Sequence, residues 1–123
     1  CWMRENIGVK NEYQLKMLKT EERAVGELYK KNKKLFVYGA GFYGKMFLRR
    51  LKFWGYEPMG VIVSAGEKRQ DEYCGYRVYE LHEVKDTKDI AVIIAVGYTL
   101  QEVIADNLEI NGITDYYKAV VLG

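Results

Sequence analysis

The sequence predicts an α/β fold, in which helices flank a mainly parallel sheet of four or five strands. Three observations support this prediction. Short apolar runs alternate with longer amphipathic segments, which is typical of strand–helix–strand units. The run at 90–96 is rich in β-branched residues, as in strands that are buried on both faces of a parallel sheet. Three glycines, spaced Gly39-x-Gly41-x-x-Gly44, separate the apolar run at 35–38 from the amphipathic segment that follows it.

Length and composition describe one ordinary globular domain. The 123 residues suffice for one hydrophobic core, and 49% hydrophobic with 29% charged residues is the balance of a soluble protein. Because the net charge is only +2, we expect no nucleic-acid partner. The longest apolar run, at 90–96, falls far short of the ~20 residues that a membrane-spanning helix needs, so we expect no membrane span.

Two further features of the sequence concern its compartment and its ends. Cys1 and Cys74 have no spacing that is typical of a disulfide framework or a metal site, and no signal peptide is visible, so we expect a cytoplasmic protein. The chain lacks an initiator methionine and stops directly after an apolar run. These ends predict a domain from a longer polypeptide, whose other domains would be its partners.

The first element that we expect is an N-terminal helix at 9–33, so that residues 1–34 form a helical extension of the domain at 35–123. Gly26 is the one residue that weakens the helical pattern. The helix would lay its apolar stripe on the domain or on a neighbouring chain, which makes it a candidate contact for a homo-oligomer. The stripe consists of Leu15, Leu18, Val25, Leu28 and Tyr29.

The next elements alternate between strand and helix. A strand at 35–38 leads through the glycine turn into a helix at 42–54, and the Gly-Tyr-Glu-Pro sequence that follows ends this helix. A second strand is expected at 59–63, and the residues at 64–74 read as a polar loop.

The C-terminal half continues the alternation. We expect a short strand at 76–79, a short helix at 81–84 and the buried strand at 90–96. A helix at 99–110 ends at an Asn-Gly pair, and a last strand is expected at 116–122. The helix at 99–110 is expected to face inward with Leu100, Val103, Ile104 and Leu108.

The glycine turn has the pattern of a dinucleotide-binding fingerprint in its required place, between a strand and a helix. Gly39 would permit the tight turn, Gly41 would let a pyrophosphate approach the backbone, and Gly44 would let the helix pack closely on the strand. The length downstream of Gly39 allows about half of a two-fold Rossmann domain. The fold prediction is therefore a three-layer half-Rossmann domain with an extra N-terminal helix.

Two further loops are expected beside the glycine turn, because ligands of open α/β sheets bind beyond the carboxyl ends of the strands. Where dinucleotide enzymes place an acid for the ribose hydroxyls, this chain has Ser64. Arg69 either favours a phosphorylated ribose or a nucleotide-sugar diphosphate, or is an exposed loop charge. Gly97 either lies close to a ribose or only ends a strand, and Tyr98 either stacks on the ligand or packs. The predicted binding residues are Gly39, Ala40, Gly41, Phe42, Tyr43, Gly44, Ser64, Arg69, Gly97 and Tyr98.

The sequence offers little that points to catalysis. His82 is the single histidine and has no recognisable nucleophile beside it in the sequence, and Cys74 lies in a polar loop without a flanking base. One histidine and scattered carboxylates do not form a pattern of metal ligands. We therefore predict neither catalytic residues nor a metal site in this domain.

Four segments carry a resemblance to a known family. They are Val-Tyr-Gly-Ala-Gly-Phe-Tyr-Gly-Lys at 37–45, Gly-Val-Ile-Val-Ser at 60–64, Gly-Tyr-Arg-Val-Tyr at 75–79 and Ile-Ile-Ala-Val-Gly at 93–97. Together they resemble a Rossmann-like module of bacterial polysaccharide-biosynthesis proteins. The module is similar to the N-terminal nucleotide-sugar-binding domain of sugar acyltransferases, to the accessory domain of nucleotide-sugar dehydratases and to domains fused to glycosyltransferases.

The resemblance covers residues 35–123 and implies phosphate contacts along the glycine turn, with the chemistry placed in another domain. It differs at the end of the second strand, where the acyltransferase relatives usually carry an acid and this chain has Ser64 and Ala65. We therefore expect a non-catalytic domain of a larger glycosyltransferase or other polysaccharide-biosynthesis protein, which binds a nucleotide-sugar or a dinucleotide. The alternatives are a fragment of an NAD(P)-dependent nucleotide-sugar dehydrogenase or dehydratase, a degenerate scaffold for oligomerisation, and a coenzyme A-binding domain.

Overall fold

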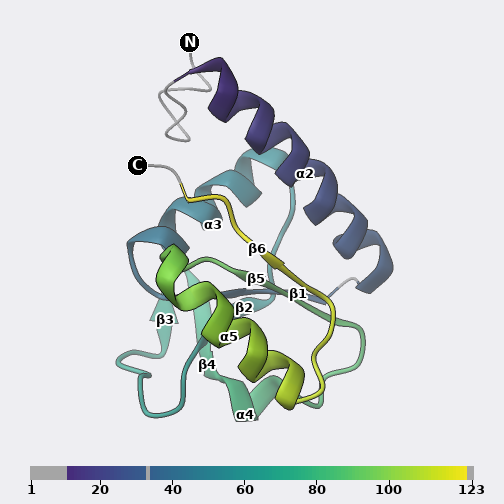
Figure 1. Cartoon of the computed structure of the whole chain (residues 1–123). Coiled ribbons are helices and arrows are strands. Elements are labelled where there is room, and N and C mark those ends of the chain that lie inside the picture. The colour runs from purple at the N-terminus through teal and green to yellow at the C-terminus, as the bar shows by residue number, and fades with distance from the viewer. Residues whose placement is uncertain (1–10, 33, 122–123) are drawn as a thin grey trace.

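A computed structural model describes residues 11–32 and 34–121 and has the three-layer α/β architecture that the sequence predicts (Figure 1). Its single sheet has the strand order β3-β4-β2-β1-β5-β6, and every neighbouring pair is parallel except β3 with β4. The mainly parallel, Rossmann-like fold is therefore confirmed. The strands are β1 (Lys34–Tyr38), β2 (Gly60–Val63), β3 (Glu72–Tyr73), β4 (Tyr76–Glu80), β5 (Ile90–Ile94) and β6 (Tyr116–Lys118).

Helices cover both faces of the sheet, as Figure 1 shows. Successive residues of a strand point to opposite faces, so β1 sends Leu35 and Val37 into one core and Phe36 and Tyr38 into the other. The first core contains residues of α2 and α3, and the second contains residues of α4 and α5. The helices are α2 (Glu12–Asn32), α3 (Phe42–Trp54), α4 (Leu81–Val84) and α5 (Tyr98–Ile110).

The sheet has six strands rather than the expected four or five, because a hairpin forms at the end of the predicted polar loop at 64–74. The two-residue strand β3 pairs antiparallel with β4, with Tyr73 opposite Tyr76. Cys74 and Gly75 both adopt positive φ, 53° and 86°, which is the geometry of a tight type I′ hairpin turn. A cysteine at the first of these positions gives no hairpin signal in the sequence, since asparagine, aspartate or glycine is usual there.

The N-terminal helix α2 belongs to the same hydrophobic core as the sheet. Leu18 and Val25, from its predicted stripe, are 2% and 0% exposed. Gly26 has a packing role, because a Cβ there would lie 2.7 Å from the hydroxyl of Tyr56. The apolar stripe of α2 thus packs against its own chain, with Leu15, Leu28 and Tyr29 half-buried beside these two residues.

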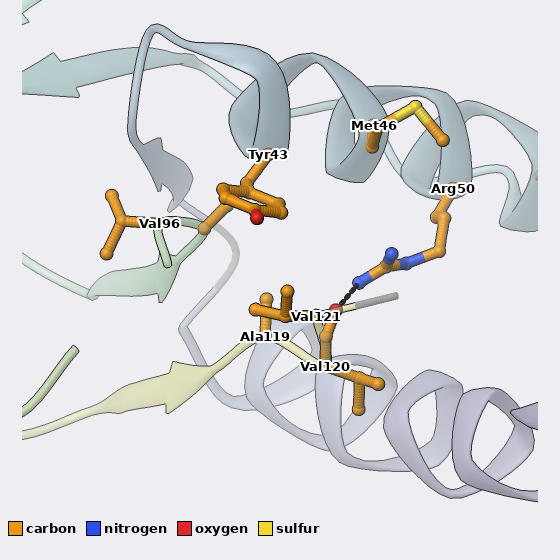
Figure 2. A pocket seen from close by; sticks show the side chains of 8 residues that line it. Tyr43, Met46, Arg50, Val96, Ala119, Val120 and Val121 are labelled. Atoms are coloured by element: carbon orange, nitrogen blue, oxygen red, sulfur yellow. Dashed lines mark hydrogen bonds between the residues drawn. The ribbon is translucent and has the colours of Figure 1, made fainter. Parts of the chain in front are cut away.

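A buried ion pair, together with a hydrogen bond from Arg50 to the segment after β6 (Figure 2), ties three segments together on this face. Arg50 of α3 lies 2.9 Å from the Glu21 carboxylate of α2 and donates a hydrogen bond of 2.8 Å to the carbonyl oxygen of Val120. The other carboxylate oxygen of Glu21 accepts a 2.5 Å hydrogen bond from the backbone N–H of Val120. Because Val120 bonds to side chains instead of a neighbouring strand, β6 ends at Lys118, short of the predicted 122.

Burial dominates the titration of this pair. It raises the pKa of Glu21, and the positive charge of Arg50 opposes that rise. It likewise lowers the pKa of Arg50, against the opposing effect of Glu21. The guanidinium also lies 5.0 Å from the ring centre of Phe47, which adds a cation–π contact. Each side chain loses its hydration on burial, and the opposite charge of its partner compensates for that loss.

We predict that Glu21→Leu lowers the free energy of unfolding by about 3 to 5 kcal/mol, since it leaves Arg50 buried without its counter-ion. The double variant Glu21→Leu/Arg50→Met removes both charges and should recover much of this loss. Urea unfolding of both variants measures the difference. A double variant that is less stable than Glu21→Leu would contradict the assignment of the cost to an unpaired buried charge.

Candidate functional site

The sheet order places a topological switch point between β1 and β5. From β1 the chain crosses through α3 to β2 on one side, whereas β5 lies on the other side of β1. The helices that follow β1 and β5 consequently leave the sheet on opposite faces, α3 on one and α5 on the other. In open α/β sheets, ligands bind at such a point, beyond the carboxyl ends of the strands.

The turn after β1 is held by close backbone contacts that require glycine. Gly39 has φ +136°, and a Cβ there would overlap the carbonyl oxygen of Ala95, directly beyond β5. The N–H of Gly39 donates a 2.9 Å hydrogen bond to the carbonyl oxygen of Ile62 in β2. A Cβ on Gly44 would overlap the carbonyl oxygen of Gly39, so α3 starts directly against the turn. Gly44 therefore acts in close packing, the role predicted for it, whereas Gly39 combines the positive φ of the predicted tight turn with a close contact to the end of β5.

Gly41 differs from these two glycines, because its missing side chain faces open space. No described atom outside its chain neighbours lies within 4 Å of a Cβ built there. Its backbone is extended, with φ −121° and ψ −158°, a conformation that any residue can adopt. The protein's own packing thus gives no reason for a glycine at this position.

Two helix N-termini converge at the same edge. Gly41 is the N-cap of α3 and Gly97 is the N-cap of α5, and within the described residues no side chain caps either helix. The first-turn N–H groups of a helix lack partners within the helix, and they carry the positive end of its dipole. The switch point therefore offers two sets of backbone donors suited to an anion.

The glycine turn and the starts of α3 and α5 line one groove of ≈ 630 Å³, a volume within the range of small-molecule binding sites. Its floor is the glycine turn and the carboxyl ends of β1, β2 and β5, and one wall is the start of α5. Of the residues predicted from the sequence, the groove includes Gly39, Ala40, Gly41, Phe42, Tyr43, Ser64 and Gly97.

The other three predicted residues lie outside the groove lining. Gly44 is buried beneath the turn. Arg69 is exposed and donates a 2.9 Å hydrogen bond to the carbonyl oxygen of Gly66, in its own loop. Tyr98 is 60% exposed, and its hydroxyl lies 3.5 Å from the carbonyl oxygen of Val121.

A polar cluster lies at the end of β2, and the sequence prediction included its Ser64 but missed Tyr38 and Glu67. The hydroxyls of Tyr38 and Ser64 are hydrogen-bonded at 2.6 Å, and Glu67 lines the groove beside them. Burial raises the pKa of Tyr38, the bond to Ser64 opposes the rise, and the negative charge of Glu67 adds to it. The phenol of Tyr38 therefore stays protonated, and either hydroxyl of the Tyr38–Ser64 pair can be the donor.

The turn after β2 explains how an acid reaches this edge. The N–H of Glu67 donates a 3.0 Å hydrogen bond to the carbonyl oxygen of Ser64, and Gly66, with φ +79°, occupies the third position of the turn. This is the pattern of a type II turn, in which glycine is preferred at that position. The sequence Ser-Ala-Gly-Glu carries the signal for this turn, which places the acid three residues beyond its expected position.

The groove also has an apolar rim, of which the sequence analysis assigned only Phe42 to the site. Leu100 and Val103 of α5 and Phe42 of α3 line the groove, although their side chains are 54%, 63% and 65% exposed. The helical pattern at 99–110 had predicted Leu100 and Val103 to face inward, whereas Ile104 and Leu108 alone of that stripe are buried. The inward-facing surface of α5 is thus narrower than predicted, and its apolar margin reaches the groove.

The two residues that the sequence analysis considered for catalysis, His82 and Cys74, both lie outside the groove lining. His82 is exposed at α4, 3.7 Å from a carboxylate oxygen of Glu80, and Cys74 is exposed at the hairpin tip. In the part of the chain that the structure describes, no three His, Cys, Asp or Glu residues form a group that could hold a metal ion. No helix among residues 11–32 and 34–121 is long and apolar enough to cross a bilayer.

Comparison with protein-family models and with curated proteins gives no match to this chain. The resemblance to polysaccharide-biosynthesis modules therefore stays a prediction. The geometry of the groove is the basis for a functional proposal.

Alanine substitutions should separate the roles of two glycines in the turn. Gly44→Ala is expected to lower the free energy of unfolding by about 1 to 3 kcal/mol, because its Cβ would overlap the Gly39 carbonyl oxygen. In Gly41→Ala the new Cβ would meet open space, and the backbone conformation is allowed for alanine. The free energy of unfolding should therefore change by no more than about 0.5 kcal/mol. Urea unfolding of the pair tests this contrast, and equal losses would refute it.

Proposed function

We propose that this domain binds the diphosphate of a nucleotide-sugar in the groove at the switch point. The observation that carries the proposal is the convergence of two helix N-termini, neither capped by a described side chain, over the glycine turn. Backbone N–H groups at such positions favour phosphate oxygens, and Gly41 leaves space for them to approach. A role in leaving space for the diphosphate would explain why position 41 is a glycine, which the protein's own packing does not require.

The rest of the groove suits the flanking parts of the same ligand. The carboxylate of Glu67 accepts hydrogen bonds from sugar or ribose hydroxyls, and Ser64 lies beside it with Tyr38. The apolar side chains of Leu100 and Val103 line the α5 wall, where a base or a sugar ring would bury its face. A ligand with a central diphosphate, sugar hydroxyls and a ring therefore matches the helix N-termini, the polar cluster and the apolar wall of the groove.

The resemblance noted from the sequence points to a nucleotide-sugar and to a larger glycosyltransferase or polysaccharide-biosynthesis protein. In that proposal the domain recognises the ligand, and the chemistry takes place in another part of the polypeptide. A dinucleotide such as NAD is the second candidate, and Glu67 is the observation that favours it. Its carboxylate reaches the end of β2, where NAD-binding domains hold the ribose hydroxyls.

A thermal-shift panel distinguishes the candidates. UDP-, GDP-, CDP- and TDP-sugars are compared with NAD, NADP and coenzyme A. A ligand that binds only the folded protein raises its apparent stability, by about 2.7 kcal/mol at a hundred times the dissociation constant. Stabilisation by one nucleotide-sugar supports the proposal, and stabilisation confined to NAD or NADP supports the second candidate. No response to any ligand would contradict both.

Gly41→Val should weaken binding of the stabilising ligand about tenfold or more, a loss of about 1.4 kcal/mol or more, because its side chain would fill the path of the diphosphate. Calorimetric titration measures the affinity. Ala65→Val is the matched control, because Ala65 is exposed and lies outside the groove lining. Equal affinity of the two variants, with both folded, would refute the placement of the diphosphate.

A further inference from the structure

A second hollow, of ≈ 430 Å³, lies on the outer side of α3 and shares no lining residue with the groove. Three cations of α3 form one wall: Lys45, Arg49 and Lys52. Leu48 lies between them, Glu57 follows the helix, and Cys74 and Tyr76 of the β3–β4 hairpin complete the lining. Two elements that are distant in the sequence therefore enclose one charged space.

The ionisable side chains that α3 contributes to this wall are all basic. Helix α3 contains four basic residues and no acidic one, and the buried Arg50 is the one that pairs with a carboxylate. Positions 45, 49 and 52 are four and three residues apart, so their side chains share one face of the helix. Within the described residues, no ion pair joins these three cations to a carboxylate. Like charges at this spacing repel one another, so the arrangement costs stability unless an anion is present.

Among the described residues, Glu57 is the one carboxylate in the lining of the hollow, and it interacts with the hairpin. Burial raises the pKa of Tyr76, and the neighbouring carboxylate of Glu57 adds to the rise through its charge and a hydrogen bond. Since three cations face one carboxylate, the hollow keeps a positive excess.

The opposite wall is held by a strained turn. Cys74 has φ +53°, a left-handed conformation that is unfavourable for a residue with a side chain. The turn nevertheless places Cys74 at the hairpin tip, in the lining of the hollow across from the cations. Such strain persists only where the surrounding structure imposes it, here through the pairing of Tyr73 with Tyr76.

We propose that this hollow is a second ligand site, independent of the groove, which binds a small soluble molecule with two or more phosphate groups. Arginine grips a phosphate through two parallel hydrogen bonds, and lysines add point charges on either side. Anionic lipid headgroups carry the same chemistry, but the cations line a recess between α3 and the hairpin. A small anion can enter such a recess, whereas the headgroups of a flat membrane surface cannot, so the recess favours a small soluble ligand.

Cys74 supplies a reporter for the test. In a Cys1→Ser background it is the one remaining cysteine, and its alkylation rate by iodoacetamide reports access to the hollow. The probe is inorganic pyrophosphate at constant ionic strength, and Gly41→Val is added so that the groove does not contribute. We expect pyrophosphate to slow alkylation about fivefold or more. Arg49→Gln should raise the half-maximal concentration about tenfold, because it removes the bidentate contact.

Arg23→Gln is the matched control, because Arg23 is exposed on α2 and lies outside the hollow. The pyrophosphate concentration that gives half-maximal protection of Cys74 should be the same in Arg23→Gln as in the parent. The proposal is overturned if pyrophosphate gives no protection, or if Arg49→Gln and Arg23→Gln behave alike while both remain folded. It is also overturned if protection requires phosphatidylcholine vesicles that contain phosphatidic acid, since the source would then be a lipid surface.

Discussion

The close approach of α3 to the end of β1 is the constraint on which the rest of the site depends. It exists because Gly39 and Gly44 lack side chains: a Cβ on the first would overlap the Ala95 carbonyl oxygen, and one on the second would overlap the carbonyl of Gly39 itself. With these contacts in place, α3 begins beside β5, and its N-terminus faces that of α5 across the switch point. The donors that we assign to a phosphate are therefore positioned by backbone packing, and not by flexible side chains.

The opposite end of α3 is fixed by different forces. Arg50 and Glu21 are both buried, and together they attach α2 and the segment after β6 to α3. Such a pair adds little net stability compared with an apolar replacement, yet loss of one partner is costly, so it favours one arrangement of the three segments over others. Tyr43, in the first turn of α3, lines the same small cavity as Arg50, beside the segment at 119–121 (Figure 2).

The sequence analysis succeeded where local pattern and packing agree. The alternation of apolar runs and the strand–glycine–helix context predicted the architecture, the tight turn at Gly39 and the close packing at Gly44. It missed features that depend on turn geometry or on distant residues. Glu67 reaches the groove only through the turn around Gly66, and the Cys74 hairpin has no usual sequence signal. The Glu21–Arg50 pair joins residues of two helices, and no spacing rule predicts which charges will be buried together.

A titration followed by ¹H–¹⁵N correlation spectra tests the central claim most directly, because the claim concerns individual backbone N–H groups. Uridine diphosphate serves as the probe, since it carries the diphosphate without committing to a sugar. We predict the largest amide shifts at Gly41, the N-cap of α3, at Phe42 and Tyr43 in its first turn, and at Tyr98 at the start of α5. Shifts confined to Lys45, Arg49 and Lys52 on the outer face of α3, or no shifts at all, would contradict the claim that the switch-point groove binds the diphosphate.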